Sequence, residues 1–204
     1  MGASSTFGGR SKRGRRSGTI GGMADTPSPI EPVELRAGDL LLRRWREDDV
    51  DAYWAALEIP GGRLWHGSTL ATRDDVVAAL ARRRDWTTGD HASWAAVGPD
   101  GRLLGSISLH RIDRDQEDGE VGYWITPTAR GRGLAPTAVE EACRWAFAEL
   151  GLHRIQLYHA VENTASARVA GKARFTCEGR LRRSHRYGDG LRHDELLWAR
   201  LATD

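Results

Sequence analysis

Apolar residues recur every three to four positions in three long stretches of the chain, the spacing that places them on one face of a helix. One stretch follows Thr72, a typical N-cap residue, and another ends at Gly151. We therefore predict helices over residues 48–58, 72–86 and 134–150. The residues expected on their buried faces are Val50, Tyr53, Trp54 and Leu57, then Val76, Val77 and Leu80, then Ala135, Ala138, Val139, Ala142, Ala146 and Leu150.

Elsewhere the pattern alternates with a period of two, or stays apolar for a few residues, which is typical of strands. We expect one strand at residues 40–45, three consecutive strands within 92–125, and three more within 153–201, where a short helix begins at Asn163. Counted along the chain, the order is β α α β β β α β α β β. This order predicts a mixed α/β (α+β) layer rather than an alternating doubly wound sheet.

Length and composition fit a single globular domain that follows a tail. The chain has 204 residues, of which 40% are hydrophobic and 28% are charged. Residues 1–22 are rich in Gly and Ser and hold five basic residues and no acidic one, and a proline-rich linker follows at 27–32. We predict a disordered basic tail and linker over residues 1–30 and one folded domain over residues 31–204.

The formal net charge of +2 comes from this tail. Residues 23–204 carry 25 basic and 28 acidic residues. A nucleic-acid-binding domain normally carries its positive excess on the folded part, so we expect no nucleic-acid binding by the folded domain. For the tail itself the sequence leaves several alternatives open: contact with nucleic acid, a solvated extension, a remnant of cloning, or a stretch upstream of a true start at Met23.

The two cysteines, Cys143 and Cys177, do not form a CxxC pair or a Cys/His cluster. We expect two buried thiols, no disulfide framework and no metal site. No apolar run approaches the roughly 20 residues that span a bilayer, and the N-terminus lacks the apolar core of a signal peptide. We therefore expect a cytoplasmic protein with no membrane partner.

The segment ARGRGLAP, residues 129–136, joins a predicted strand to a predicted helix. The first-turn N–H groups of a helix have no partner within it, and Gly131 and Gly133 lack the Cβ atoms that would keep a ligand away. With the helix dipole and the charges of Arg130 and Arg132, this segment suits a pyrophosphate. The alternative is a plain strand-to-helix turn with solvated arginines. A dinucleotide-binding Rossmann motif would follow the first strand, and these glycines come too late in the chain for that.

The runs EVGYWITPTARGRGLAPTAVEEACRWAF and LGLHRIQLYHAVENTASARVAGKARFTCEGRLRRSHR resemble the acyl-coenzyme A-dependent N-acetyltransferases of the GNAT superfamily, in the branch of the ribosomal-protein N-terminal (RimJ/RimL-type) acetyltransferases. The resemblance covers about residues 35–202. Arg130, Gly133 and Ala135 meet the superfamily's pattern of Arg or Gln, two residues, Gly, one residue, and Gly or Ala. It implies the GNAT fold, a mixed and mostly antiparallel central sheet of about six to seven strands flanked by about four helices.

The resemblance also implies an activity, the transfer of the acetyl group of the co-substrate acetyl-CoA to an amine by direct attack in a ternary complex. The expected acceptor is the N-terminal α-amino group of a protein or peptide. A small-molecule amine and a non-catalytic acyl-CoA-binding module are the alternatives, and a homodimer stays open. The residues implied at the coenzyme are Ile125, Arg130, Gly131, Arg132, Gly133, Leu134, Ala135, Asn163 and Ser166, with no metal.

An amine must be neutral to attack a thioester, so the reaction benefits from a base. The resemblance places this base at Glu120 and a proton donor for the departing thiolate at Ser166. For Glu120 the alternative is an exposed carboxylate at a strand edge, and for Ser166 a hydroxyl that bonds only to backbone. Three weaker alternatives for the base are His110, His159 and Tyr187.

The sequence departs from the family pattern in the turn before Phe175, where Arg174 replaces the usual glycine, so we expect an altered turn. Pro136, in the first turn of the helix, removes one phosphate-binding N–H. The acceptor-binding loops carry no recognisable code. Trp65 and His66 either line the mouth of the acceptor site or only pack the loop.

Overall fold

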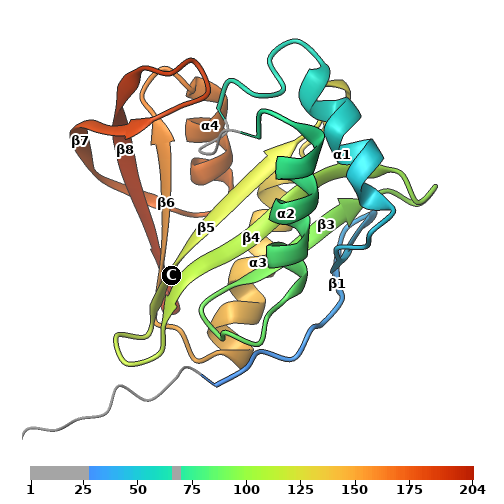
Figure 1. The fold of residues 1–204 in the computed structure, drawn as a ribbon. Helices are drawn as coiled ribbons and strands as arrows, with labels where there is room; N and C mark the ends of the chain where they lie inside the picture. Colours follow the sequence, from blue (N-terminus) through green and yellow to red (C-terminus); the bar gives the residue numbers. More distant parts are fainter. Residues whose placement is uncertain (1–27, 66–69) are drawn as a thin grey trace, which may run out of the picture.

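The computed structural model describes residues 28–65 and 70–204, and these form a central sheet covered by helices on both faces (Figure 1). The eight strands stand in the order β1-β2-β3-β4-β5-β6-β8-β7. The strands are β1 (Leu35–Ala37), β2 (Leu40–Arg44), β3 (Ala92–Val97), β4 (Leu103–Asp113), β5 (Asp118–Ile125), β6 (Arg154–Ala160), β7 (Thr176–Arg186) and β8 (Arg192–Leu201). The helices are α1 (Asp49–Glu58), α2 (Arg73–Arg84), α3 (Leu134–Glu149) and α4 (Thr164–Lys172), with a 3₁₀ turn η1 (Pro127–Ala129).

The predicted mixed sheet and its four helices are confirmed, but the sheet has one strand more than expected. The extra strand is β1, which pairs with β2 through a two-residue turn at Gly38 and Asp39. Gly38 has φ +61°, a left-handed conformation that suits glycine. Because β1 is only three residues long, it shows no hydrophobic period of its own, and the sequence gives no signal for it.

One pair of neighbouring strands, β5 and β6, is parallel, whereas all the other pairs are antiparallel. The register of this parallel pair covers Asp118–Glu120 of β5 and residues 154–156 of β6. Beyond these residues the two strands diverge, which Figure 1 shows as a wedge that widens toward the C-terminal ends of the strands. The second half of β5 therefore has its hydrogen-bonding edge toward β6 unpaired with that strand.

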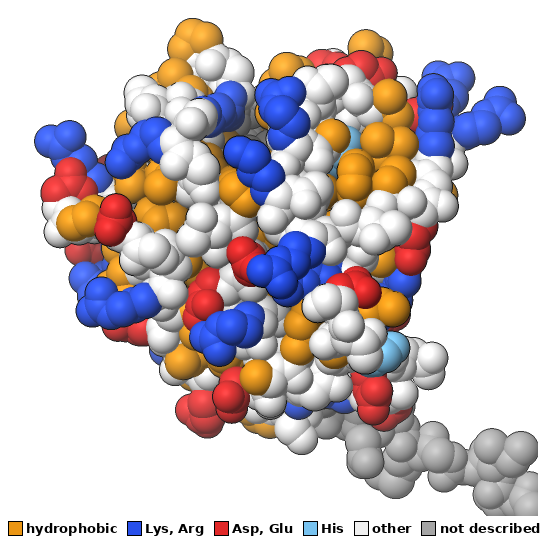
Figure 2. All heavy atoms as spheres, turned by 180° about the vertical axis from the view of Figure 1, so that it is seen from behind, with side chains coloured by type: hydrophobic (Ala, Val, Ile, Leu, Met, Phe, Trp, Pro, Cys, Tyr) orange, Lys and Arg blue, Asp and Glu red, His pale blue; other side chains and the backbone are white. Residues whose placement is uncertain are grey.

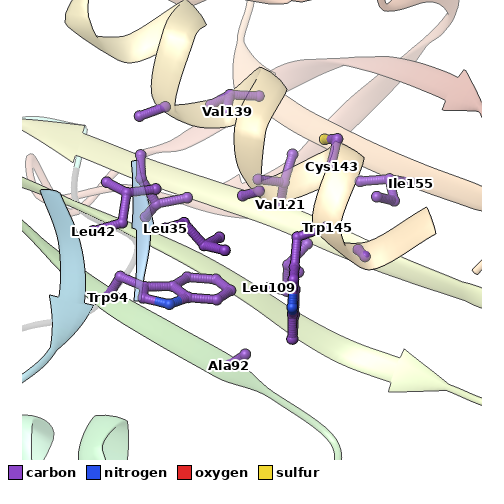
Figure 3. Close-up of a cluster of buried hydrophobic side chains, with 14 of the residues drawn as sticks. Leu35, Leu42, Ala92, Trp94, Leu109, Val121, Val139, Cys143, Trp145 and Ile155 are labelled. Carbon is purple, nitrogen blue, oxygen red and sulfur yellow. The ribbon is translucent and has the colours of Figure 1, made fainter. Parts of the chain in front are cut away.

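The sheet separates two hydrophobic cores. Every residue of β3 is buried, and its side chains alternate between the two faces: Trp94 packs on the α3 side, and Ala95 packs on the α1 and α2 side. On the α3 side Trp94 meets Trp145 edge to face, with ring centroids 5.3 Å apart (Figure 3). In β5 the same alternation places Tyr123 against the first core and Trp124 in the second.

Local signals for the helices are confirmed at α2, where Thr72 and Asp75 form a capping box. The Thr72 hydroxyl accepts from the Asp75 N–H at 3.1 Å, and the Asp75 carboxylate accepts from the Thr72 N–H at 2.8 Å. Hydrogen bonding of the Asp75 carboxylate to the Thr72 N–H, followed by that to the Thr72 hydroxyl, lowers the pKa of Asp75. The predicted burial of Val77 was wrong, since Val77 is 43% exposed; the inward face of α2 carries Val76, Ala79 and Leu80 instead.

The predicted burial of the thiols is correct for Cys143 and wrong for Cys177. Cys143 lies on the buried face of α3, and burial raises the pKa of its thiol to about 12. Cys177 is exposed near the start of β7, an edge strand whose side chains are mostly solvated.

At the N-terminal side, the fold reaches into the predicted linker. Ile30 is 5% exposed, and its N–H donates to the carbonyl of Trp86 at 3.1 Å. Ile30 thus belongs to the packed structure. The predicted disordered tail, over its first 27 residues, lies outside the described residues.

The face behind the sheet carries basic and acidic side chains interspersed with one another, and no single basic area covers it (Figure 2). No helix in the described part of the chain has the length and apolar character needed to cross a membrane.

Candidate acetyl-transfer site

The predicted anion cradle lies between the end of β5 and the start of α3. Gly131 and Gly133 have φ values of +79° and +77°, and a Cβ built on either glycine would meet no atom within 4 Å among the described residues beyond its chain neighbours. The first-turn N–H groups of a helix have no partner within it. In α3 the N-cap residue is Gly133, which has no side chain to accept from them. Backbone donors, helix dipole and Cβ-free space coincide, which is the arrangement that binds phosphate groups.

Arg130 does not point its guanidinium into free space beside this cradle. Its Nε donates to the carbonyl of Ile125 at 3.1 Å, and its Nη2 donates to the carbonyl of Gly61 at 3.3 Å. Burial lowers the pKa of Arg130. The side chain therefore braces the end of β5 against the loop after α1, although Arg130, like Arg132, is exposed to solvent.

A groove of about 220 Å³ runs from the cradle to the N-terminus of α4. It brings together segments that are far apart in the sequence: the end of β5, the start of α3 and the start of α4. Of the predicted coenzyme residues, those that line the groove are Ile125, Arg130, Gly131, Gly133, Leu134, Ala135, Asn163 and Ser166.

The backbone N–H of Ile125 faces the diverging β6. Successive N–H groups of a strand alternate between its two edges. The next one, the Thr126 N–H, donates to the carbonyl of Leu104 in β4 at 2.9 Å. The Ile125 N–H is therefore directed to the other edge, beyond Glu120, the last β5 residue that pairs with β6. Because β5 and β6 splay there, this N–H points into the gap between the strands, where it can donate to a carbonyl oxygen of a ligand.

At the start of α4, Asn163 and Ser166 occupy different positions in the hydrogen-bond network. The Asn163 side chain accepts from the Ser166 N–H at 3.2 Å and so caps the helix, as expected for an N-cap asparagine. The Ser166 hydroxyl is buried and lies 2.5 Å from the hydroxyl of Tyr123. Burial raises the pKa of Tyr123 to about 12, with the bond to Ser166 acting in the opposite direction. Both hydroxyls therefore keep their protons at neutral pH.

A second and larger cavity, about 610 Å³, adjoins the groove. Its walls come from β4, β5, β6 and the β7–β8 hairpin, and it shares residues with the groove. The shared residues are Trp65, Tyr123, Trp124 and Ser166. The two cavities thus meet at the pair of hydroxyls.

Glu120 lines this larger cavity, and its side chain is only 16% exposed, so it is no solvated carboxylate at a strand edge. Arg111 donates to Glu120 Oε1 at 2.6 Å. His110, directly opposite in β4, lies with Nδ1 3.2 Å from the Glu120 carbonyl and with Nε2 3.8 Å from Oε2. Burial lowers the pKa of His110, against the opposing effect of the carboxylate.

Two of the alternative bases are engaged in other bonds. Trp198 Nε1–H donates to His159 Nε2 at 2.9 Å, so the proton of this imidazole sits on Nδ1 and faces the Ala160 carbonyl at 2.8 Å. Burial lowers the pKa of His159. Tyr187 donates to Glu195 at 2.7 Å, and burial, followed by this bond, raises the pKa of Tyr187. Neither residue has a basic atom free to accept a proton.

Trp65 lines both cavities and packs edge to face on Tyr187, with ring centroids 5.6 Å apart. Both alternatives for Trp65 therefore hold: its side chain lines the cavities, and it packs the loop after α1 against Tyr187. His66, the other residue predicted at the acceptor mouth, lies outside the described residues. Among those that are described, no group of three His, Cys, Asp or Glu side chains is placed to hold a metal ion.

One protein-family model matches more than half of the chain. Residues 39–176 match the model of the acetyltransferase (GNAT) domain. The chain belongs to the GNAT acetyltransferase family. Its GNAT fold is also that of Mycobacterium smegmatis RimJ, solved in complex with CoA-disulfide, at a TM-score of 0.75 and 24% identity over 87% of this chain and 88% of that one.

Three curated GNAT relatives match shorter stretches. YdaF of Bacillus subtilis (strain 168), provisionally named a ribosomal N-acetyltransferase, is 36% identical over 52% of this chain and 57% of its own length. The ribosomal-protein-serine acetyltransferase of Escherichia coli (strain K12) is 30% identical over 54% of this chain and 62% of its own length. The spermidine N(1)-acetyltransferase of Vibrio cholerae is 33% identical over 39% of this chain and 46% of its own length. These matches span about half the length of the relatives.

Two residues at this GNAT site were not predicted from the sequence. Tyr123 lies within the GYW run, but its partner Ser166 is 43 residues away, and only the folded sheet brings them together. Glu195 is a buried carboxylate of β8 on the wall of the larger cavity. No local signal points to Glu195, because β8 does not alternate regularly between apolar and polar residues or between buried and exposed ones.

Proposed function

We propose that this protein transfers the acetyl group of acetyl-CoA to the N-terminal α-amino group of a protein or peptide, by direct attack in a ternary complex. One observation carries this proposal: the two cavities meet at the hydroxyls of Tyr123 and Ser166, beside the Ile125 N–H. Separate cavities allow both substrates to be bound together. The buried hydroxyl pair favours catalysis over a module that only binds acyl-CoA.

Acetyl-CoA fits the smaller groove because its cradle offers what a pyrophosphate needs. The N–H groups of the first turn of α3 would hold the phosphate oxygens where Gly131 and Gly133 leave space, and Arg132 would add charge. Pro136 contributes no N–H to this set. Asn163, which lines the same groove, would contact the coenzyme arm.

When bound, acetyl-CoA supplies a thioester whose carbonyl carbon forms a bond with the acceptor nitrogen as its bond to sulfur breaks. The Ile125 N–H would stabilise the charge that develops on the carbonyl oxygen. Ser166, backed by Tyr123, would give a proton to the leaving sulfur. Glu120 would take the proton of the amine, directly or through water. The proton lost by nitrogen and the proton gained by sulfur then balance.

An α-amino group suits the observed setting of Glu120. Its pKa of about 7.7 to 8.0 leaves on the order of a tenth of the amine neutral at pH 7, whereas a lysine near 10.4 is neutral in well under one molecule in a thousand. One oxygen of Glu120 is already bonded to Arg111. An acceptor that demands little of its base is therefore the better match, and the similarity to the ribosomal-protein-serine acetyltransferase supports it.

A small-molecule amine is the second candidate acceptor. It is supported by the similarity to the spermidine N(1)-acetyltransferase and by a cavity of about 610 Å³, which is large enough for a small extended amine.

The test is the release of free CoA thiol with three acceptors: a peptide with a free N-terminus, the same peptide blocked at its N-terminus but carrying a lysine, and spermidine. Acetyl-CoA binding is measured in parallel by calorimetry. We expect the free N-terminus to give the highest kcat/KM. Binding without turnover of any acceptor would reduce the protein to a binding module, and a preference for lysine or spermidine would overturn the proposed acceptor.

A further inference from the structure

Glu195 of β8 is a buried carboxylate that the proposed reaction does not use. It is 8% exposed and lines the larger cavity, the proposed acceptor site, which we call the acceptor cavity. The Tyr187 hydroxyl donates to its Oε1 at 2.7 Å, and the Ser184 hydroxyl donates to its Oε2 at 2.8 Å. Among the described residues, no Arg, Lys or His nitrogen lies within 4.0 Å of this carboxylate.

A buried carboxylate without a cation is costly unless hydrogen bonds stabilise its charge. The hydroxyls of Tyr187 and Ser184 supply two such hydrogen bonds. Each carboxylate oxygen also keeps acceptor capacity beyond the single bond it receives. Glu195 therefore presents to the cavity a negative charge that is held in place but not neutralised.

The two arginines that line this cavity contact other groups. Arg111 pairs with Glu120, and the Arg83 guanidinium lies over the rings of Trp45 and Tyr53, 5.6 and 5.2 Å from their centroids. Burial lowers the pKa of His159, against the opposing effects of its bond to the Ala160 carbonyl and of the Glu195 charge. None of these groups is placed to neutralise Glu195.

Aromatic rings surround the same point. Tyr187, which donates to Glu195, contacts Trp65 at 5.6 Å and His185 at 4.8 Å between ring centroids. A carboxylate bordered by aromatic faces is a typical site for an ammonium or guanidinium group.

Glu195 stands apart from the proposed base. Along β6, Glu195 pairs with Ala160 and Glu120 pairs with Gln156, four residues earlier. Four residues of strand span about 13 Å. One cationic group cannot contact both carboxylates, so an acceptor that reaches both needs two nitrogen centres.

We propose that Glu195 is an anionic subsite that binds a second positive charge of the acceptor, away from the reacting amine. This inference rests on the proposed function and sharpens it: the acceptor is an amine with a further cationic group, such as a peptide with a basic residue after its N-terminal one, or a diamine.

The experiment compares acceptors that differ only in this second charge. Seryl-lysyl and seryl-norleucyl peptides, with the lysine side chain blocked by dimethylation so that it stays charged but does not react, form one pair. A singly dimethylated diamine and the corresponding monoamine form the other. We expect wild-type kcat/KM to favour the charged member of at least one pair about tenfold or more, mainly through KM. The pair that shows the preference tells a peptide from a small amine.

Glu195→Gln should bring this ratio close to one, since it keeps an oxygen acceptor but removes the charge. Tyr187→Phe, which removes one bond and keeps the charge, should retain a ratio above about threefold, which separates lost charge from disturbed packing. The exposed Glu149→Gln, with the same change in net charge, should leave the ratio unchanged. A wild-type ratio near one, or one that survives in Glu195→Gln, would overturn the subsite. Absence of turnover with every acceptor would instead refute the proposed function.

Discussion

The smaller groove, proposed to bind the coenzyme, and the larger cavity, proposed to bind the acceptor, are built in different ways. The groove depends on backbone: two left-handed glycines, the unpaired N–H groups of a helix start and the N–H of a splayed strand. The acceptor cavity depends on side chains from β4, β5, β6 and the β7–β8 hairpin. Backbone geometry serves a ligand that does not change, whereas side chains can be substituted one at a time to select another acceptor.

The largest expected effect is at the backbone site. Gly133→Val would put a branched side chain in the space of the cradle, so we expect acetyl-CoA affinity to fall by more than about 100-fold in calorimetry. Gly151→Val is the matched control, since Gly151 also has a positive φ, +69°, and open space around its Cβ, but follows α3 at its far end. Both variants should lose similar stability from left-handed strain, and only Gly133→Val should lose binding. Equal affinity in the two would contradict the cradle.

On the acceptor side, Glu120→Gln should lower kcat by roughly 100-fold near neutral pH, within the usual range for a positioned base. The loss should shrink as pH rises, because the fraction of neutral amine grows without the help of the enzyme. Acetyl-CoA affinity should hardly change, since the carboxylate belongs to the other cavity. A pH–rate profile with a peptide acceptor measures this, and a wild-type kcat across the profile would leave proton removal to water.

At the junction, Ser166→Ala and Tyr123→Phe should each lower kcat by about 10- to 100-fold, and the double variant should be little worse than either, because the hydroxyls act as one bonded pair. Acyl donors with a better leaving thiol should recover much of the loss. With the pKa of Tyr123 near 12, wild-type kcat should show no fall from its deprotonation up to about pH 10. Additive losses would mean that the two hydroxyls act independently.

The smallest effect concerns a left-handed residue outside both cavities. Arg174, in the turn after α4, has φ +64°, a left-handed conformation that favours glycine. Arg174→Gly should relieve about 1–2 kcal/mol of left-handed strain and lose part of that to chain entropy, for a net gain of about 0.5–1 kcal/mol in urea unfolding. Arg168→Gly, within α4, should cost about 1 kcal/mol. A destabilised Arg174→Gly would show that the 3.4 Å ion pair with Glu140 outweighs the strain.

Sequence reasoning reached the backbone site because its determinants are local. Glycines at 131 and 133, a helix that begins just after them and an asparagine at the start of α4 are all readable within a few residues. The acceptor cavity was reached only in part. Glu120 was found through the family resemblance, but its partner Arg111 and the link from Tyr123 to Ser166 depend on strand pairing and on the side-chain directions of separate elements.

Errors and omissions in the prediction have the same origin. Arg130 lines the groove beside the cradle, but the sequence did not indicate that its guanidinium also bonds to two carbonyls, one of them from a loop 69 residues away. The departure at Arg174 was expected to alter the turn, whereas the arginine takes up the left-handed conformation of a glycine. Side-chain direction and tolerated strain are decided by tertiary packing, which residue patterns do not encode.

The β7–β8 hairpin occupies the edge of the sheet and contributes Ser184, Tyr187 and Glu195 to the acceptor cavity, while no residue of it lines the coenzyme groove in the described part of the chain. It is therefore a peripheral module through which a gene family can diversify. Substitutions in this one hairpin, or its exchange between relatives, can change which amine is acetylated while every descendant keeps the same acetyl donor.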